Sequence, residues 1–196
     1  MAELRIGCLV MAAGSGSRFG RNKLEAVVDG KSLLRRSLEA VPAEEFAQVT
    51  VVTQYDAAAA LAEEFGFTVV RNDRPEDGLS RTVRLGTEAM AGCGAILYQV
   101  ADQPLLEQET VRRELEYFRT HPDHIVGLAH NGVRGNPCIF PRKFFPELMA
   151  LEGDVGGSAV IRAYPEELLL YETSAAELRD VDTVEALAAV QEDRQI

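Results

Sequence analysis

The sequence of 196 residues predicts an α/β protein: one Rossmann-like domain over residues 1–196, with a mostly parallel central sheet and helices on both faces. Two observations lead to this fold class. Short apolar runs rich in Val and Ile alternate along the chain with segments of helical pattern, as in proteins built from βαβ units. The length suffices for one hydrophobic core and is most simply explained by a single domain.

Four short apolar runs in the first half of the chain are expected to be parallel strands: Ile6–Met11, Val49–Thr53, Thr68–Arg71 and Ala95–Val100. The segments between them are expected to be helices: Ser32–Glu39, Asp56–Phe65 and Leu79–Ala91. Asp56 is a good N-cap for the second helix, because its side chain can accept a bond from a free N–H group. Gly66 is suited to end that helix.

The second half of the chain begins with an amphipathic helix over Glu107–Thr120, in which Val111, Leu115 and Phe118 share one face. Three later apolar runs are predicted strands: His124–Ala129, Cys138–Phe140 and Leu168–Tyr171. Three further segments are predicted helices: Phe144–Leu151, Gly156–Arg162 and Thr183–Glu192.

Composition narrows the class of protein. The formal charge of −11, from 20 basic and 31 acidic residues, argues against a nucleic-acid partner, since phosphates require a basic face. No apolar run approaches the roughly 20 residues of a membrane span, and the N-terminus lacks the pattern of a signal peptide. Cys8, Cys93 and Cys138 are scattered and suggest neither a disulfide framework nor a metal site. A cytoplasmic protein without a membrane partner is expected.

The first predicted strand leads into a loop of small residues that ends at Lys23. Glycines let a backbone approach a ligand, and its N–H groups can then bind an anion. Arg18, Arg21 and Lys23 add positive charge, and no acidic residue lies between Glu3 and Glu25. The loop therefore indicates a small polyanion, for which a nucleoside triphosphate is suitable. It contains no Gly-Lys-Ser/Thr of the Walker type, and its glycine spacing differs by one residue from the dinucleotide pattern.

Polar residues also follow the third and fourth predicted strands. Asn72 comes after the third strand, and Asp102 comes after the fourth. The carboxyl ends of parallel strands share one edge of a sheet, so these residues and the cationic loop are expected together. A carboxylate there can hold Mg²⁺, which uses few protein ligands and takes others from phosphates and water. Asp102 is alternatively a turn residue before Pro104.

The segment from Ala12 to Lys23 resembles the signature L-x-A-A-G-x-S-x-R-x-G-x-x-K of nucleotidyltransferases. Within the MobA-like NTP transferase superfamily, the chain is most similar to the molybdenum-cofactor cytidylyltransferases. The likeness continues in family order over nearly the whole chain, through Asn72, Gly78–Gly86, Asp102–Pro104, Gly135–Pro137, Gly153–Gly156 and Asp180–Thr183. The resemblance implies a nucleotidyltransferase fold.

The resemblance also implies roles for individual residues. Lys23, Arg18 and Asp102 would be catalytic. The nucleotide would be bound by Ala12, Ala13, Gly14, Ser15, Gly16, Ser17, Arg18, Lys23, Asn72, Gly78, Thr82 and Asp102. The acceptor would be bound by Gly135, Asn136, Pro137 and Asp154, and the metal by Asp102 and Asp154. Taken alone, these segments also fit local structure: a capped helix near Gly78, a hairpin turn at Gly135–Pro137, and N-caps at Asp154 and at Asp182 or Thr183.

The implied reaction joins CMP from CTP to the terminal phosphate of a molybdopterin-type cofactor, with Mg²⁺ as cofactor and release of pyrophosphate. A client molybdenum hydroxylase is the further partner that this implies. Ala13 matches the cytidylyl branch, where the guanylyl branch usually has glycine. Gly157-Ser158 departs from the family's Gly-Ala-Arg, so a cation expected near the acceptor is missing. Three alternatives remain: a guanylyltransferase for the same cofactor, a cytidylyltransferase for a sugar or polyol phosphate, and a non-catalytic cofactor carrier.

Overall fold

The computed structural model describes residues 4–14 and 22–193. A seven-stranded sheet lies at its centre, in the order β5-β4-β1-β6-β8-β7-β9. The strands are β1 (Ile6–Ala12), β4 (Gln48–Thr53), β5 (Thr68–Arg71), β6 (Ala95–Val100), β7 (Ile125–His130), β8 (Val133–Pro141) and β9 (Leu168–Glu172). Strand β8 is antiparallel to both of its neighbours, and the other neighbouring pairs are parallel.

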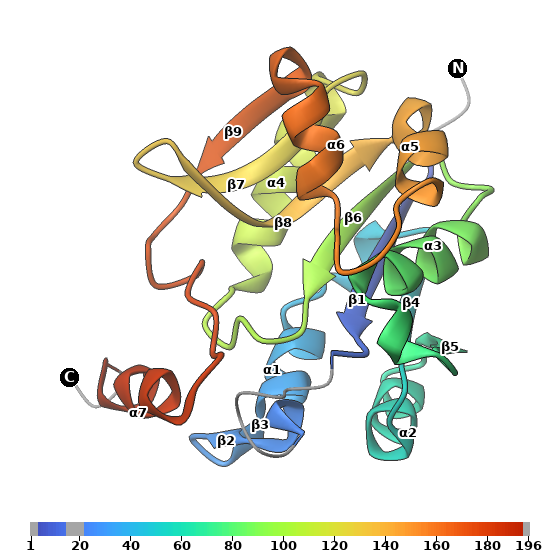
Figure 1. Ribbon diagram of the computed structural model, residues 1–196. Helices are drawn as coiled ribbons and strands as arrows, with labels where there is room; N and C mark the ends of the chain where they lie inside the picture. Colours follow the sequence, from blue (N-terminus) through green and yellow to red (C-terminus); the bar gives the residue numbers. More distant parts are fainter. Residues whose placement is uncertain (1–3, 15–21, 194–196) are drawn as a thin grey trace.

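Helices cover both faces of this sheet (Figure 1). One face packs against α1 (Leu33–Glu39), α2 (Asp56–Glu64) and α4 (Gln108–Thr120), and the other against α3 (Leu79–Ala89), α5 (Phe145–Met149) and α6 (Ser158–Ala163). Helix α7 (Val184–Asp193) packs against the small hairpin of β2 (Val27–Val28) and β3 (Lys31–Ser32). The described residues also include 3₁₀ helices at Lys23–Glu25, Ala43–Glu45, Pro75–Asp77, Arg142–Phe144 and Pro165–Glu167. The predicted fold class is confirmed.

Strand β1 shows why both faces need cover. Successive side chains of a strand point to opposite faces. Cys8 and Val10 belong to the core on the side of α1, whereas Leu9 packs in the core on the side of α3. All three are fully buried. A strand that is apolar on both sides is therefore placed in the middle of the sheet, between two layers of helices.

Two local predictions are corrected by the structure. Helix α2 begins at Asp56, its N-cap residue is Tyr55 without a side-chain cap bond, and the Asp56 carboxylate accepts a bond from Arg71 instead. The segment Gly135–Pro137 is not a hairpin turn but part of β8, which is longer than predicted. The turn of that hairpin lies at Asn131 and Gly132, where φ is positive. Gly66 follows α2 with φ of +74°, as predicted for the end of a helix.

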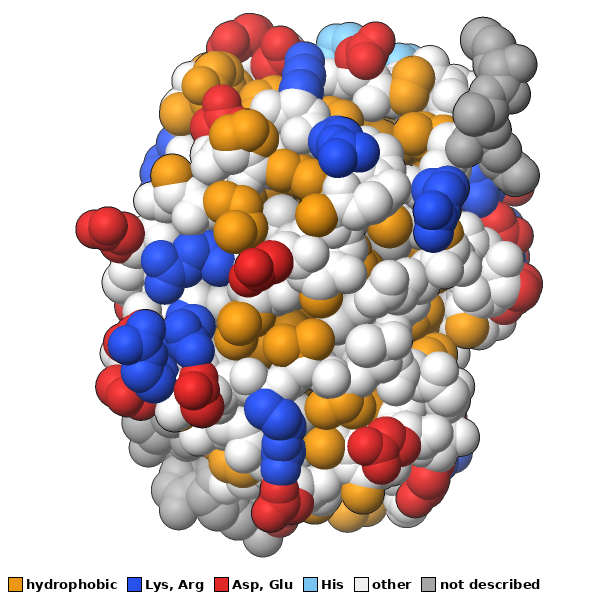
Figure 2. All heavy atoms as spheres, turned by 90° about the vertical axis from the view of Figure 1, so that its right-hand side faces the viewer, with side chains coloured by type: hydrophobic (Ala, Val, Ile, Leu, Met, Phe, Trp, Pro, Cys, Tyr) orange, Lys and Arg blue, Asp and Glu red, His pale blue; other side chains and the backbone are white. Residues whose placement is uncertain are grey.

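The parallel strands β5, β4, β1 and β6 direct their carboxyl ends to one edge of the sheet, so the segments that follow them meet there. On the molecular face seen in Figure 2, basic side chains lie mostly next to acidic ones and do not form one continuous basic surface. Among the described residues, none of the helices has the length and apolar character needed to cross a membrane.

Candidate active site

Lys23 lies at the centre of the charged groups at the carboxyl edge of the sheet. Its Nζ is 2.5 Å from Oδ2 of Asp102 and 2.7 Å from Oδ1 of Asp182. Burial by itself would lower the pKa of Lys23, but the charges and hydrogen bonds of the two carboxylates outweigh it and raise this pKa above its ordinary value. Lys23 is therefore a fixed positive charge at this edge.

The segment that carries Asp182 is bound to the loop after β6 through the backbone as well. The N–H of Val181 donates to the carbonyl of Asp102 at 2.9 Å. This contact brings Asp180 close to Asp102, and burial, followed by repulsion from Asp102, raises the pKa of Asp180 to about 6. Thr183, not Asp182, caps α7, since its Oγ1 accepts a bond from the N–H of Ala186 at 3.1 Å. Asp182 is thus left to pair with Lys23.

Asp102 has one carboxylate oxygen that the described residues do not use. Oδ2 is bonded by Lys23, while Oδ1 is buried and has no hydrogen-bond partner in the described part of the chain. A buried carboxylate oxygen without a partner is costly and calls for a ligand. Residues 4–14 and 22–193 contain no group of three His, Cys, Asp or Glu side chains able to hold a metal. A hard cation held by Asp102 would then take its other ligands from phosphates and water, as Mg²⁺ does.

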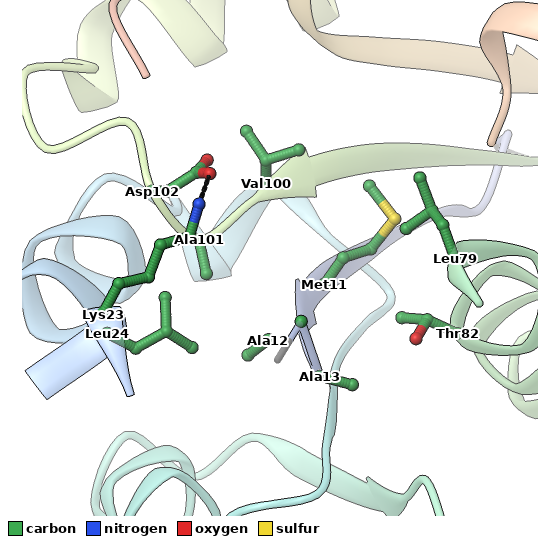
Figure 3. Close-up of a pocket in the computed structure, with 11 residues that line it drawn as sticks. Met11, Ala12, Ala13, Lys23, Leu24, Leu79, Thr82, Val100, Ala101 and Asp102 are labelled. Atoms are coloured by element: carbon green, nitrogen blue, oxygen red, sulfur yellow. Dashed lines mark hydrogen bonds and ion pairs between the residues drawn. The ribbon is translucent and has the colours of Figure 1, made fainter. Parts of the chain in front are cut away.

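A pocket of about 210 Å³ opens beside Lys23 and Asp102. Figure 3 shows that Lys23 points toward Asp102 on one side of it, while Leu79 and Thr82 of α3 lie on the opposite side. The end of β1 and the residues after it supply part of the lining: Met11, Ala12, Ala13 and Gly14. Of the predicted nucleotide-binding residues, six described ones therefore line one pocket: Ala12, Ala13, Gly14, Lys23, Thr82 and Asp102. Ser15, Gly16, Ser17 and Arg18 lie outside the described residues.

The last residue of β4 and the two residues after it hold the start of the predicted phosphate loop, a role that sequence reasoning missed. Thr53 Oγ1 donates to the carbonyl of Ala12 at 2.9 Å, and Gln54 Nε2 donates to that of Ala13 at 2.7 Å. The hydroxyl of Tyr55 donates to the carbonyl of Gly14 at 2.9 Å. Three successive residues thus bond three successive carbonyls. In the sequence, the one indication of this role was that Thr53, Gln54 and Tyr55 lie at the end of a predicted strand.

The start of α3 is covered by the loop that contains Asp154. The N–H of Leu79 donates to Oδ1 of Asp154 at 3.3 Å, and the N–H of Ser80 donates to the carbonyl of Gly153 at 3.2 Å. Gly78 has φ of +85°, and a Cβ there would lie 2.5 Å from the carbonyl carbon of Gly153. Asp154 therefore caps α3 and not α6, whose N-cap is Gly157. Its partner Leu79 lies across the pocket from Asp102 (Figure 3).

Asn72 and Thr82 form a buried pair that joins the end of β5 to α3. Asn72 Nδ2 lies 3.2 Å from Oγ1 of Thr82, and Oδ1 accepts bonds from the N–H of Arg74 and from Nε of Arg81. Thr82 faces the pocket, whereas Asn72 is not among the residues that line it. Asn72 thus positions the side chain of Thr82, and only Thr82 of this pair contacts the pocket.

Three of the four predicted acceptor residues lie at the start of β8, and the fourth, Asp154, lies beside the start of α3. Gly135 and Asn136 line a larger hollow of about 470 Å³, and Pro137 follows them in the strand. Arg134 borders the same hollow, and its Nη2 donates to Oγ of Ser158 at 2.8 Å. The sequence lacks the arginine of the family's Gly-Ala-Arg, since Gly157 is followed by Ser158. In the structure, Arg134 brings a guanidinium to Ser158 from another element.

The sheet is mostly parallel, and a lysine and a carboxylate line a pocket at its carboxyl edge. These features are typical of α/β proteins that bind a ligand at the carboxyl ends of their strands. Residues 8–168 match the model of the MobA-like NTP transferase domain, and the chain belongs to this family. The superfamily expected from the motifs is thereby confirmed.

Two curated proteins are similar to part of the chain. The bifunctional protein GlmU of Bifidobacterium animalis subsp. lactis is 30% identical over 130 residues, which are 62% of this chain and 28% of that protein. The 2-C-methyl-D-erythritol 4-phosphate cytidylyltransferase of Dehalococcoides mccartyi is 30% identical over 118 residues, 57% of this chain and 52% of that protein. The chain thus spans about half or less of the length of these relatives.

Solved structures share the fold over nearly the whole chain. Rv0371c of Mycobacterium tuberculosis has a TM-score of 0.79 at 24% identity, covering 98% of this chain and 100% of that one. A nucleotidyl transferase of Methanothermobacter has a TM-score of 0.78 at 23% identity, covering 98% and 99%. A CMP:2-keto-3-deoxy-manno-octonic acid synthetase complexed with CTP has a TM-score of 0.75 at 16% identity, covering 97% and 98%. At these identities the likeness shows the fold.

Proposed function

We propose that residues 1–196 form one nucleotidyltransferase domain that joins CMP from CTP to the terminal phosphate of a molybdopterin-type cofactor and releases pyrophosphate. One observation carries the proposal. Lys23 and Asp102, which lie 79 positions apart in sequence, meet 2.5 Å apart at a pocket lined by the end of β1, and one oxygen of Asp102 is left without a partner. The pocket thus combines a fixed cation with a carboxylate that can hold a metal.

The proposed chemistry needs alignment and charge neutralisation more than proton transfer. An anionic phosphate of the acceptor attacks the α-phosphorus of CTP, and no general base is required to activate it. Lys23 would neutralise the triphosphate, together with Arg18, which lies outside the described residues. Mg²⁺ on Asp102 would supply further neutralisation of phosphate charge. A metal contact by Asp154 stays a prediction, because its Oδ1 accepts the bond from Leu79.

Different observations support CTP as the nucleotide donor and a molybdopterin-type cofactor as the acceptor. Ala13 is buried and lines the pocket, and its methyl group leaves less room for the base, which suits a pyrimidine. One similar protein is a cytidylyltransferase, and a structure with this fold is complexed with CTP. The motif resemblance supports the molybdopterin-type acceptor and a client molybdenum hydroxylase. A cytoplasmic location belongs to the same proposal, since Cys8, Cys93 and Cys138 are all free and buried, as suits a reducing compartment.

Three competing functions make different use of the same site. A guanylyltransferase would accept GTP in the pocket beside Ala13, and a sugar- or polyol-phosphate cytidylyltransferase would use CTP with another phosphate acceptor. A non-catalytic carrier would bind the finished dinucleotide and would have no use for a lysine placed between two carboxylates. The Lys23 pairings therefore favour an enzyme.

Pyrophosphate release from wild-type protein tests these functions directly. Each of CTP, GTP, ATP and UTP is incubated with Mg²⁺, with and without molybdopterin. We expect release from CTP that depends on molybdopterin, and a larger rise of the melting temperature with CTP than with GTP or ATP, because a ligand stabilises the state that binds it. Tight binding of the finished cofactor without any release of pyrophosphate would contradict the enzyme.

Lys23→Ala separates an enzyme from a carrier. We expect pyrophosphate release to fall about 100-fold, because charge that acts mainly on the departing pyrophosphate contributes to rate more than to binding. The affinity for the finished dinucleotide cofactor should change much less. Lys31→Ala is the matched control, since Lys31 forms an exposed ion pair with Glu39 at 2.8 Å and should leave both quantities unchanged. A carrier would show only a loss of affinity in Lys23→Ala.

A further inference from the structure

Arg134 is a cation without a carboxylate partner among the described residues, in a chain with a formal charge of −11. It is half-buried, and its contacts are neutral. Nη1 lies 3.1 Å from the carbonyl of Gly135 and 3.3 Å from Sγ of Cys138, and Nη2 lies 2.8 Å from Oγ of Ser158. These groups orient the guanidinium but do not neutralise it, so its charge is available for an anion.

Two N–H donors of the Arg134 guanidinium are left for a ligand. An arginine has five N–H donors in one plane, and the three described bonds use two on Nη1 and one on Nη2. The remaining donors are the Nε–H and one N–H of Nη2, which have no partner in the described part of the chain. These two nitrogens form one edge of the fork, which can bind two oxygens of a phosphate together.

The position of Arg134 is built into the sheet. A Cβ at Gly127 on the neighbouring strand would lie 3.3 Å from Cγ and 3.5 Å from Cδ of Arg134, so the arginine stem packs closely against the backbone of β7 at this glycine. The pairing of β7 with β8 is irregular at the same place, between Gly127 and Ala129. Because its side chain is already held in place, Arg134 loses little freedom when it binds a ligand.

Arg134 also lies between two spaces that a transfer reaction needs. Together with Asn136 it borders both the 470 Å³ hollow and a smaller pocket of about 120 Å³. The smaller pocket shares Met11, Leu79 and Val100 with the pocket beside Lys23. A phosphate that attacks a bound nucleotide must lie between the nucleotide and the rest of the acceptor, and Arg134 stands at that junction.

We infer that Arg134 binds the attacking phosphate of the acceptor, and that the acceptor is a phosphomonoester whose remaining part fills the 470 Å³ hollow. The inference rests on the proposed function, because it assigns the acceptor side of the same reaction. Arg134 supplies the cation that the sequence alone does not predict near Ser158.

The test compares Arg134→Gln and Arg134→Lys with wild-type protein. Dissociation constants are measured for molybdopterin and for molybdopterin whose phosphate has been removed by a phosphatase. We expect Arg134→Gln to weaken binding of the phosphorylated ligand about 10- to 100-fold and that of the dephosphorylated ligand little, with partial recovery in Arg134→Lys. The KM of the acceptor should rise while the affinity for CTP stays unchanged. Arg113→Gln is the matched control, since Arg113 pairs with Glu109 on an exposed helix face.

A second probe separates this inference from the proposed acceptor. Binding of inorganic phosphate is followed by ³¹P NMR with CTP and Mg²⁺ in excess, and we expect saturable binding in wild type that is lost in Arg134→Gln. Equal phosphate binding in both proteins, or none in wild type, would overturn the inference, as would equal losses for the two molybdopterin ligands. Loss of phosphate binding in Arg134→Gln, with no binding of molybdopterin to wild type, would reject the proposed acceptor and support the Arg134 site.

Discussion

The two halves of the sheet carry their functional side chains in different ways. In the half formed by β5, β4, β1 and β6, Lys23 and Asp102 come after strand ends, and Lys23 pairs with Asp102 and also with Asp182 from the segment that follows β9. In the half formed by β8, β7 and β9, Arg134 and Asn136 lie within a strand, and Arg134 bonds only neutral groups among the described residues.

The direction of β8 explains this difference. Parallel strands end at the ligand edge of a sheet, so the residues after them reach the site. Strand β8 is antiparallel to β6, with Tyr98 opposite Cys138, so the residues before Cys138 lie toward the carboxyl end of β6. The first residues of the antiparallel strand β8 therefore lie at the same edge of the sheet as the segments that follow the parallel strands. In the half formed by β5, β4, β1 and β6, the proposed nucleotide half, Lys23 is paired with carboxylates; in the half formed by β8, β7 and β9, the proposed acceptor half, Arg134 bonds only neutral groups among the described residues.

The largest expected effect is the loss of pyrophosphate release when Asp102, just after the end of β6, is changed. Asp102→Asn should lower pyrophosphate release about 100- to 1,000-fold, because an amide keeps the shape but loses the charge that pairs with Lys23 and that, in the proposed function, would hold Mg²⁺. The melting temperature should change little, since the bond from Val181 uses the backbone carbonyl. Glu109→Gln is the control, because Glu109 forms an exposed pair with Arg113 at 3.0 Å, away from the pocket lining. Near-normal release in Asp102→Asn would make Asp102 a turn residue.

A second prediction concerns Glu114 of α4, which packs against β7 and β8 of the acceptor half. Glu114 is fully buried, neither carboxylate oxygen has a hydrogen-bond partner in the described residues, and burial raises its pKa well above the ordinary value of 4.5. The folded protein therefore holds this proton more tightly than the unfolded chain does. Its contribution to stability is complete below the unfolded pKa and is lost as pH rises, by at most about 1.4 kcal/mol per pH unit.

Glu114→Gln should remove this loss. Between pH 5 and pH 8, the free energy of unfolding of wild type should fall relative to that of the variant by about 1 to 3 kcal/mol, measured by urea denaturation. Glu116→Gln on the exposed side of the same helix is the control and should follow wild type. Parallel pH profiles of wild type and Glu114→Gln would show that the carboxyl group does not titrate as its burial implies.

The smallest expected effect lies where the two halves meet, at Asp154. Asp154→Ala should lower the free energy of unfolding by about 1 kcal/mol, because the N–H of Leu79 loses its cap, whereas Asp154→Asn keeps an oxygen that can accept this bond. Thermal unfolding of both variants measures the difference, and equal stability of Asp154→Ala and wild type would contradict the cap. A loss of pyrophosphate release in Asp154→Asn at unchanged stability would support the metal contact predicted from the sequence.

The sequence alone predicted the framework and the position of Lys23 and Asp102 at one edge of the sheet. Apolar runs and helical periodicity are local patterns, so they placed β1, β4, β5 and β6 close to their observed bounds and predicted helices on both faces. Because these strands are parallel, residues such as Lys23 and Asp102 could be assigned to one edge from their order along the chain. Motif resemblance then identified the superfamily.

Tertiary structure decided which of these residues meet and what each one does. Lys23 and Asp182 are 159 positions apart, and Asp154 caps a helix that begins 75 positions earlier. No local pattern records such a pairing, because it depends on how distant elements pack. The same limit hid the role of Arg134, whose sequence neighbours suggested a turn until the antiparallel course of β8 carried it to Ser158. Strand direction and packing set these contacts, whereas hydrophobic periodicity determines only the elements that make them.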